Sequence, residues 1–194
     1  MKKYELTEET ILVCDLALYR IRALRDFGRV KAGDLGGFIE TEDNLSHDGG
    51  AWVYDDAEVF GNAKVYGIAW VFENAKVYGN AKVSGDALVF GNARVFGNAK
   101  VYGKAEVFGN TWVFGTAKVF GTARVFENTK VYGDICVSGD SKVSGDAQSR
   151  KEERERCVSI VEVERDILGG AQDVQVREAC DRIINSIREE GEVQ

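Results

Sequence analysis

The fold is decided by a six-residue repeat in the middle of the chain. Residues 75–104 read AKVYGN-AKVSGD-ALVFGN-ARVFGN-AKVYGK, with alanine, valine and a glycine corner at fixed places in each hexad. The valine recurs every sixth residue from Val53 to Val143 without exception. No helix has a period of six, whereas repeats of fixed length are typical of stacked, solenoid architectures. The sequence therefore predicts a solenoid built from short strands.

Each hexad is expected to form one short strand and one sharp corner. Alternate side chains of an extended chain share a face, so Ala63 and Val65 point to one side, and Lys64 and Tyr66 to the other. The invariant apolar positions should face inward, which makes the core narrow and leaves the large side chains outside. That inversion of the usual pattern directs attention to the outer faces.

The corners show how many hexads make one coil. Glycine is replaced there only by Asp55, Glu73 and Glu127, which lie multiples of 18 residues apart. A coil of three hexads places such positions on one edge, where glycine tolerates the positive φ of a sharp turn. The next positions along that edge are Asp56, Asn74, Asn92, Asn110, Asn128 and Asp146. Their stacked amides are expected to hydrogen-bond from coil to coil.

This hexad resembles the repeat of the left-handed parallel β-helix, which reads aliphatic-x-x-x-small-x with three hexads in each triangular coil. The resemblance covers residues 51–147. It implies a mainly β, single-stranded left-handed parallel β-helix, or hexapeptide-repeat solenoid. We expect an N-terminal β cap over residues 1–50, with strand-like pieces at 16–24 and 37–40, and a helical C-terminal segment over residues 148–194.

The N-terminal segment adds a second resemblance. Residues 24–40 read LRDFGRVKAGDLGGFIE, followed by Asn44-Leu45-Ser46 and Ala51-Trp52-Val53-Tyr54. These residues are similar to the start of a family of hexapeptide-repeat proteins from bacteria, prophages and phages. Its members are labelled as transferases or polymer-forming proteins. The resemblance spans about the first three quarters of the chain and implies an architecture rather than an activity.

One outer face carries an apolar patch. Its residues are Trp52, Tyr54, Trp70, Phe72, Leu88, Phe90 and Phe108. A patch of this size is larger than a soluble monomer normally exposes. Either a terminal segment of the same chain packs on it, or it is an interface with another subunit or a protein partner, since such interfaces are rich in aromatic anchors.

A second face carries a lysine ladder beside aromatic residues. Its members are Lys64, Lys82, Lys100 and Lys118. Such a row could follow a phosphate backbone, but residues 51–147 contain ten acidic and ten basic residues. The net charge of -7 comes from the two flanking segments. A neutral solenoid lacks the excess positive charge of nucleic-acid-binding proteins, so we disfavour nucleic acid as a partner.

The C-terminal segment is interpreted as an assembly element. A charged run at residues 150–156 precedes an apolar stretch whose conformation, helix or strand over 156–166, the pattern leaves open. Apolar residues at three- and four-residue spacing then predict an amphipathic helix. The candidate oligomerisation residues are Val176, Cys180, Ile183, Ile184 and Ile187. Resemblance to trimeric and filamentous β-helices implies a homo-oligomer, such as a trimer or dimer.

Candidate catalytic chemistry is sparse. Acyltransferases of the hexapeptide-repeat fold use a histidine base and a loop that projects from the coils to bind the acyl carrier. This chain has one histidine, His47, in a predicted turn where we expect it to be solvated, and its hexads contain no insertion. The four cysteines are far apart, without the spacing of a zinc site. We therefore predict no cofactor and no metal.

The function predicted from the sequence is a non-catalytic, oligomeric scaffold or binding protein. Free cysteines and the acidic start of the chain favour a cytoplasmic location and no membrane association. The phage-like resemblance extends this to a host-directed role, for example inhibition of a bacterial defence system. Two alternatives stay open, a self-assembling filament-like β-helix protein and a hexapeptide-repeat acyltransferase.

Overall fold

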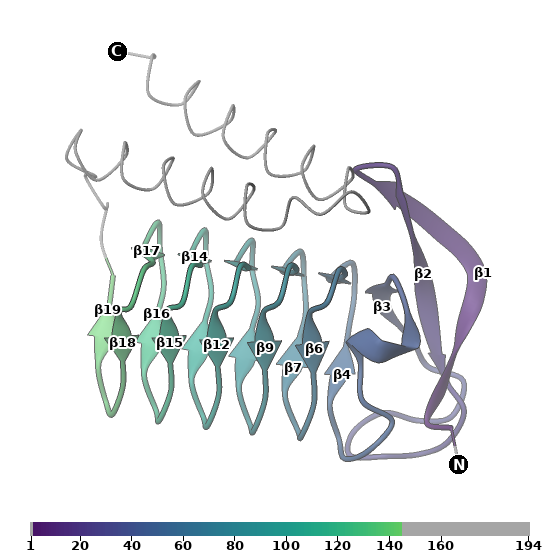
Figure 1. Ribbon diagram of the computed structural model, residues 1–194. Coiled ribbons are helices and arrows are strands. Elements are labelled where there is room, and N and C mark those ends of the chain that lie inside the picture. Colours follow the sequence, from purple (N-terminus) through teal and green to yellow (C-terminus); the bar gives the residue numbers. More distant parts are fainter. Residues whose placement is uncertain (1, 145–194) are drawn as a thin grey trace. The chain divides into compact units, whose positions relative to one another are not determined.

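The computed structural model describes residues 2–144, which fold as a mainly β, parallel solenoid. Two-residue strands recur once in each hexad, and three of them make one coil (Figure 1). Each strand pairs in parallel with the strand 18 residues away, as Val89 does with Val71 and Val107. The mainly β solenoid and the coil of three hexads are thus confirmed.

Three sheets run along the solenoid. The capped sheet contains β1 (Tyr4–Val13), β2 (Leu16–Ala23), β3 (Leu35–Ile39), β5 (Glu58–Val59), β8 (Lys76–Val77), β11 (Arg94–Val95), β14 (Trp112–Val113) and β17 (Lys130–Val131). The phenylalanine sheet contains β4 (Trp52–Val53), β7 (Trp70–Val71), β10 (Leu88–Val89), β13 (Glu106–Val107), β16 (Arg124–Val125) and β19 (Lys142–Val143). The lysine sheet contains β6 (Lys64–Val65), β9 (Lys82–Val83), β12 (Lys100–Val101), β15 (Lys118–Val119) and β18 (Cys136–Val137).

The core is a column of alanine and valine side chains. From Ala51 to Val125 every alanine at the inward position and every repeat valine is buried. Thr111 and Thr129 replace alanine there, and their hydroxyls donate to the carbonyls of Phe108 at 2.7 Å and Phe126 at 2.6 Å. Threonine is therefore tolerated because the chain's own corner satisfies its hydroxyl.

The corners have the left-handed backbone that the sequence predicted. Every corner glycine from Gly61 to Gly139 has a positive φ, and so do Asp55 (52°), Glu73 (60°) and Glu127 (64°). The backbone N–H of Glu73 donates to a carboxylate oxygen of Asp55 at 3.0 Å. At these three corners a residue other than glycine carries the strain of this conformation.

The predicted asparagine ladder is confirmed for three coils of the edge that carries these residues. The amide of Asn92 donates to that of Asn110 at 3.0 Å, and Asn110 donates to Asn128 at 3.0 Å. A further amide pair joins Asn62 to Asn80 at 3.2 Å on another edge.

The N-terminal segment closes one end of the solenoid. Strands β2 and β3 lie close to the expected pieces at 16–24 and 37–40, whereas β1 was not predicted. Parallel stacking begins before residue 51, because β3 pairs with β5 through Phe38 and Ile39, and Leu45, just after the 3-10 helix η1 (Glu42–Asn44), bridges to Val65. The cap thus contributes an irregular first coil.

Side chains of this segment satisfy carbonyls that an open solenoid end would leave without donors. The Asn44 amide donates to the carbonyls of Gly61 at 2.8 Å and Ala63 at 3.0 Å. The Lys3 ammonium donates to Ala51 at 2.8 Å, and the Arg20 guanidinium donates to the carbonyl of Asp55 at 3.1 Å. Buried carbonyls need such partners, so these polar residues belong to the fold.

The predicted C-terminal features lie outside the described residues. These are the helical segment at 148–194, the open choice at 156–166 and the candidate oligomerisation residues Val176, Cys180, Ile183, Ile184 and Ile187.

Two corner substitutions separate backbone strain from coil contact. At Gly85 (φ 69°) an added Cβ would lie 2.9 Å from both the N and O of Gly103, whereas at Gly133 (φ 65°) it would meet nothing within 4 Å. We expect Gly133→Ala to lower the free energy of unfolding by about 1 kcal/mol through φ alone. Gly85→Ala should cost about 1–3 kcal/mol more, because the coils must separate. Equal losses in denaturant unfolding would contradict this account of coil contact.

Candidate functional site

The N-terminal end of the predicted apolar patch is covered by the chain itself. Trp52 is fully buried, with ring centroids 6.0 Å from Tyr4, 5.2 Å from Phe27 and 6.4 Å from Tyr54, all in edge contacts. Of the two interpretations that the sequence left open, self-coverage holds for Trp52. This indole is part of the cap core and is not available to a partner.

The next members of the patch lie at the border of this cover. The Arg29 guanidinium lies 5.5 Å above the Trp70 ring, and Tyr54 meets Trp70 edge-on at 5.5 Å. Both aromatic residues are half-buried. They form a rim between the cap and the open part of the phenylalanine sheet.

Beyond this rim a stack of phenylalanine rings follows the solenoid. Successive centroids from Phe72 to Phe90, Phe108 and Phe126 are 4.6, 4.8 and 5.3 Å apart, with nearly parallel rings. All four side chains are half-buried, as is Leu88, which pairs in register with Trp70. We call Phe72, Phe90, Phe108 and Phe126 the phenylalanine ladder. Phe126 was omitted from the predicted patch, although its 18-residue spacing from Phe108 identifies it.

Charged residues bound the ladder at its C-terminal end. The Arg124 guanidinium pairs with the Glu106 carboxylate at 2.7 Å and lies 5.3 Å above the Phe108 ring. An apolar centre with a charged edge is the usual composition of a protein–protein interface. Aligned aromatic rings also lose little conformational entropy when a partner covers them.

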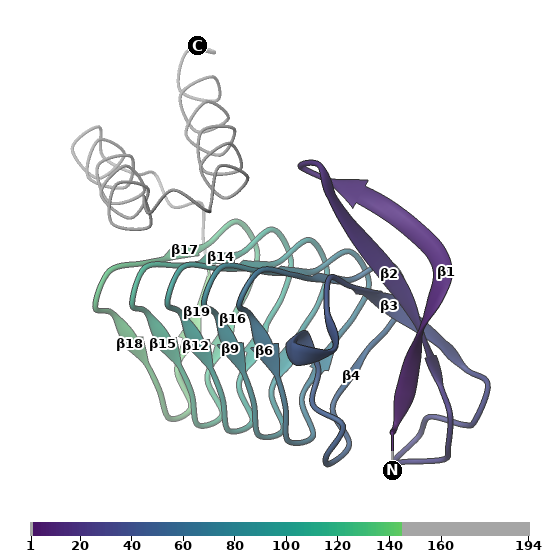
Figure 2. The ribbon, with the colours of Figure 1, turned by 45° about the vertical axis from the view of Figure 1, so that its right-hand side comes forward.

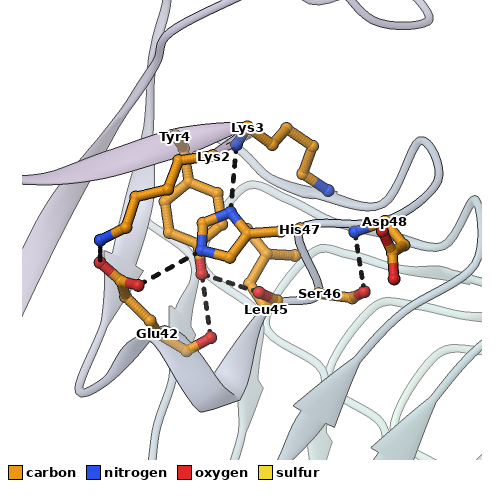
Figure 3. A network of polar contacts seen from close by, with 8 residues as sticks. All are labelled: Lys2, Lys3, Tyr4, Glu42, Leu45, Ser46, His47 and Asp48. Atoms are coloured by element: carbon orange, nitrogen blue, oxygen red, sulfur yellow. Dashed lines mark hydrogen bonds and ion pairs between the residues drawn. The ribbon is translucent and has the colours of Figure 1, made fainter.

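His47 is held within the cap, and the expectation that it is solvated is wrong. Its Nδ1 accepts the backbone N–H of Lys3 at 3.2 Å, and its Nε2 lies 3.4 Å from a carboxylate oxygen of Glu42 (Figure 3). The ring stacks on Tyr4 at 4.3 Å. These contacts join residues far apart in the sequence, so the local turn pattern around His47 could not reveal them.

This geometry assigns the histidine a structural role. Because Nδ1 accepts a hydrogen bond, the imidazole proton lies on Nε2, where it faces Glu42. Glu42 is itself bound by the Lys2 ammonium at 2.6 Å, and hydrogen bonds from Lys2 and His47 lower its pKa. A general base needs a nitrogen lone pair directed at its substrate, whereas the lone pair of His47 is used inside the cap.

Lys3 is the unusual ionisable group of the cap. Its side chain is fully buried, with the ammonium 5.0 Å from the Phe27 ring centroid. Burial, reinforced by the positive charge of Arg25, lowers the pKa of Lys3 to about 8. Burial likewise raises the pKa of the Tyr4 phenol, whose hydroxyl donates to the carbonyl of Leu45 at 2.7 Å. The cap therefore contains a lysine whose charge opposes folding.

The remaining candidate chemistry was surveyed over residues 2–144. No group of three or more His, Cys, Asp or Glu side chains in this range is placed to hold a metal ion. Cys14 and Cys136 are free thiols. The described part of the chain contains no helix long and apolar enough to cross a membrane.

Comparison with known proteins gives one partial likeness. The chain is similar to the uncharacterized acetyltransferase YdcK of Escherichia coli strain K12, with 37% identity over 76 residues. The matched stretch is 34% of this chain and 23% of YdcK. The chain thus matches less than a quarter of that relative's length. No family model matches the chain.

The buried lysine makes the stability of the cap depend on pH. The ordinary pKa of lysine is 10.5, and that of Lys3 is about 8, so the unfolded chain binds more protons between these values. The free energy of unfolding should therefore rise with pH, by about 2 kcal/mol from about pH 7 to about pH 9.5. Lys3→Met should remove this rise, measured by chemical denaturation.

The exposed neighbour provides the matched control, because Lys2→Met should keep the rise. The pH range ends below about 10 because the raised pKa of Tyr4 withdraws stability only above its ordinary value of 10.0. The same pH dependence in all three proteins would show that Lys3 is not the titrating group.

Proposed function

We propose that this protein is a non-catalytic, homo-oligomeric scaffold that binds other proteins through its outer faces. In this proposal the subunits meet along the phenylalanine ladder, and the remaining faces serve partners. The observation that carries the proposal is the stacked, half-buried row from Phe72 to Phe126. The cap covers Trp52 but leaves this row open to a further contact among the described residues.

The character of the ladder favours a contact between copies. Interfaces between permanent subunits are more hydrophobic than transient ones, and large aromatic side chains dominate their energy. The rings are spaced by the coils, so a second solenoid presents a row of the same period. Leu88 and Trp70 extend the apolar surface beside the rings.

The ladder can be tested with residues that the repeat itself tolerates. Serine occupies the position after the valine at Ser84 and Ser138. We expect Phe90→Ser/Phe108→Ser to reduce the mass in solution to that of the 21.4 kDa monomer, measured by light scattering during size exclusion. The matched control is Tyr102→Ser/Phe120→Ser, which removes a stacked pair from the lysine sheet and should leave the oligomer intact.

A third variant separates the ladder from the C-terminal segment, the other proposed assembly element. If Ile184→Asp/Ile187→Asp yields monomers while Phe90→Ser/Phe108→Ser does not, the C-terminal residues assemble the protein. The ladder would then be assigned to another protein. A monomeric native protein would contradict the oligomeric scaffold.

An acyltransferase activity is the second candidate, because YdcK is named as an acetyltransferase. Against a histidine-dependent mechanism stands the placement of both ring nitrogens of His47 within the cap. We expect no thiol release from acetyl-coenzyme A with hydroxyl or amine acceptors. If release is detected, His47→Gln decides the mechanism. A loss of about a hundredfold or more in kcat, with unchanged thermal unfolding, would establish His47 as the base and overturn our proposal.

Two extensions depend on the cellular setting. A host-directed role, such as inhibition of a bacterial defence system, follows from the resemblance to phage and prophage proteins. A filament-like assembly follows from the polymer-forming members of the same family. Electron microscopy at high protein concentration distinguishes them, because a discrete scaffold gives particles of one size.

A further inference from the structure

The lysine sheet carries a row of four cations in one register. Lys64, Lys82, Lys100 and Lys118 occupy the outward position of β6, β9, β12 and β15, and all four are exposed. Each lies directly opposite the next in the parallel ladder. Figure 2 shows these strands side by side along one side of the solenoid. None of the four has an ion pair with an acidic residue in the range 2–144.

The other two sheets treat the same position differently. On the capped sheet Lys76 pairs with Glu58 at 2.9 Å, and on the phenylalanine sheet Arg124 pairs with Glu106 at 2.7 Å. Like charges directly opposite in a ladder destabilise it, at a strand spacing of about 4.8 Å. The hexad accepts Glu, Trp, Leu or Arg at this position elsewhere, so folding does not require the row of lysines.

We propose that the lysine sheet is the docking surface for an acidic segment of a partner protein. The inference rests on the binding function proposed above and names the chemistry of the partner. Carboxylates of the partner would relieve the repulsion within the row. The amides of Asn62 and Asn80, paired at 3.2 Å on the adjoining edge, and the exposed Asn98 offer hydrogen bonds beside it.

A protein partner fits this face better than a nucleic acid. Four lysines at about 4.8 Å spacing span only about 15 Å, whereas nucleic-acid affinity needs many phosphate contacts. The positions beside the row read Tyr66, Ser84, Tyr102 and Phe120, and only the last two stack, at 5.0 Å. This gives no continuous platform for bases. The chain's net charge of -7 also disfavours a long polyanion.

A second copy of the chain is not the occupant. A two-fold contact between two lysine sheets would place one row of cations against another, which charge repulsion opposes. The phenylalanine ladder has no such conflict. The two faces are therefore suited to different contacts, one between copies and one with an acidic partner.

The test uses the full chain and fluorescently labelled poly-L-glutamate as the acidic probe. We expect Lys82→Gln/Lys100→Gln to weaken binding about tenfold in fluorescence anisotropy at low salt. The matched control, Lys130→Gln/Lys142→Gln, removes the same charge from the other two sheets and should change the affinity less than about twofold. The lysine-sheet variant should also melt about 2 °C higher, because repulsion within the row is removed.

Several results would overturn the inference. Equal weakening in both variants would show attraction to net charge rather than to this face. Tighter binding of a single-stranded oligothymidylate, lost in Tyr102→Ser, would assign the face to nucleic acid. No binding of poly-L-glutamate would remove the docking surface.

The proposed assembly fails separately from this inference. Its readout is the mass of Phe90→Ser/Phe108→Ser, which is independent of the lysine sheet. An unchanged oligomer in that variant, together with face-specific loss of poly-L-glutamate binding, would reject the subunit contact and keep the docking surface.

Discussion

The structure depends on the close approach of successive coils, which the corner residues make possible. A left-handed backbone at each corner turns the chain sharply, and small inward side chains let the three strands of a coil close around a narrow core. Strict spacing then stacks every position on its counterpart 18 residues away. A Cβ at Gly91 would lie 2.8 Å from the N of Gly109, so the contact leaves almost no room for change.

This stacking turns single choices in the hexad into continuous surfaces. One repeated aromatic position gives the phenylalanine ladder, one repeated amide gives the pairs from Asn92 to Asn128, and one repeated lysine gives a charged row. Such surfaces are long and flat, which suits them to recognise other macromolecules. The polar groups that could support chemistry, His47 and Lys3, are instead used to close the N-terminal end.

The sequence predicted whatever repeats and missed whatever joins distant segments. The period alone identified the inward valines, the positive φ at Glu73 and the asparagine ladder. The burial of Trp52 could not be predicted, because Phe27 and Tyr4 cover it from outside the repeat. Strand β1 was missed for the same reason, since the pairing and cap contacts that make it a strand are not periodic. The repeat describes the column but not its end.

The central claim is that the phenylalanine ladder is buried in the protein as it exists in solution. Hydroxyl-radical footprinting of the full chain tests it directly, with each residue's oxidation rate normalised to that of the unfolded chain. The account predicts strong protection of Phe90 and Phe108 in concentrated protein, released on dilution, while Tyr66, which is 42% exposed, stays reactive throughout. Oxidation of Phe90 and Phe108 at the same rate in concentrated and dilute protein would contradict it.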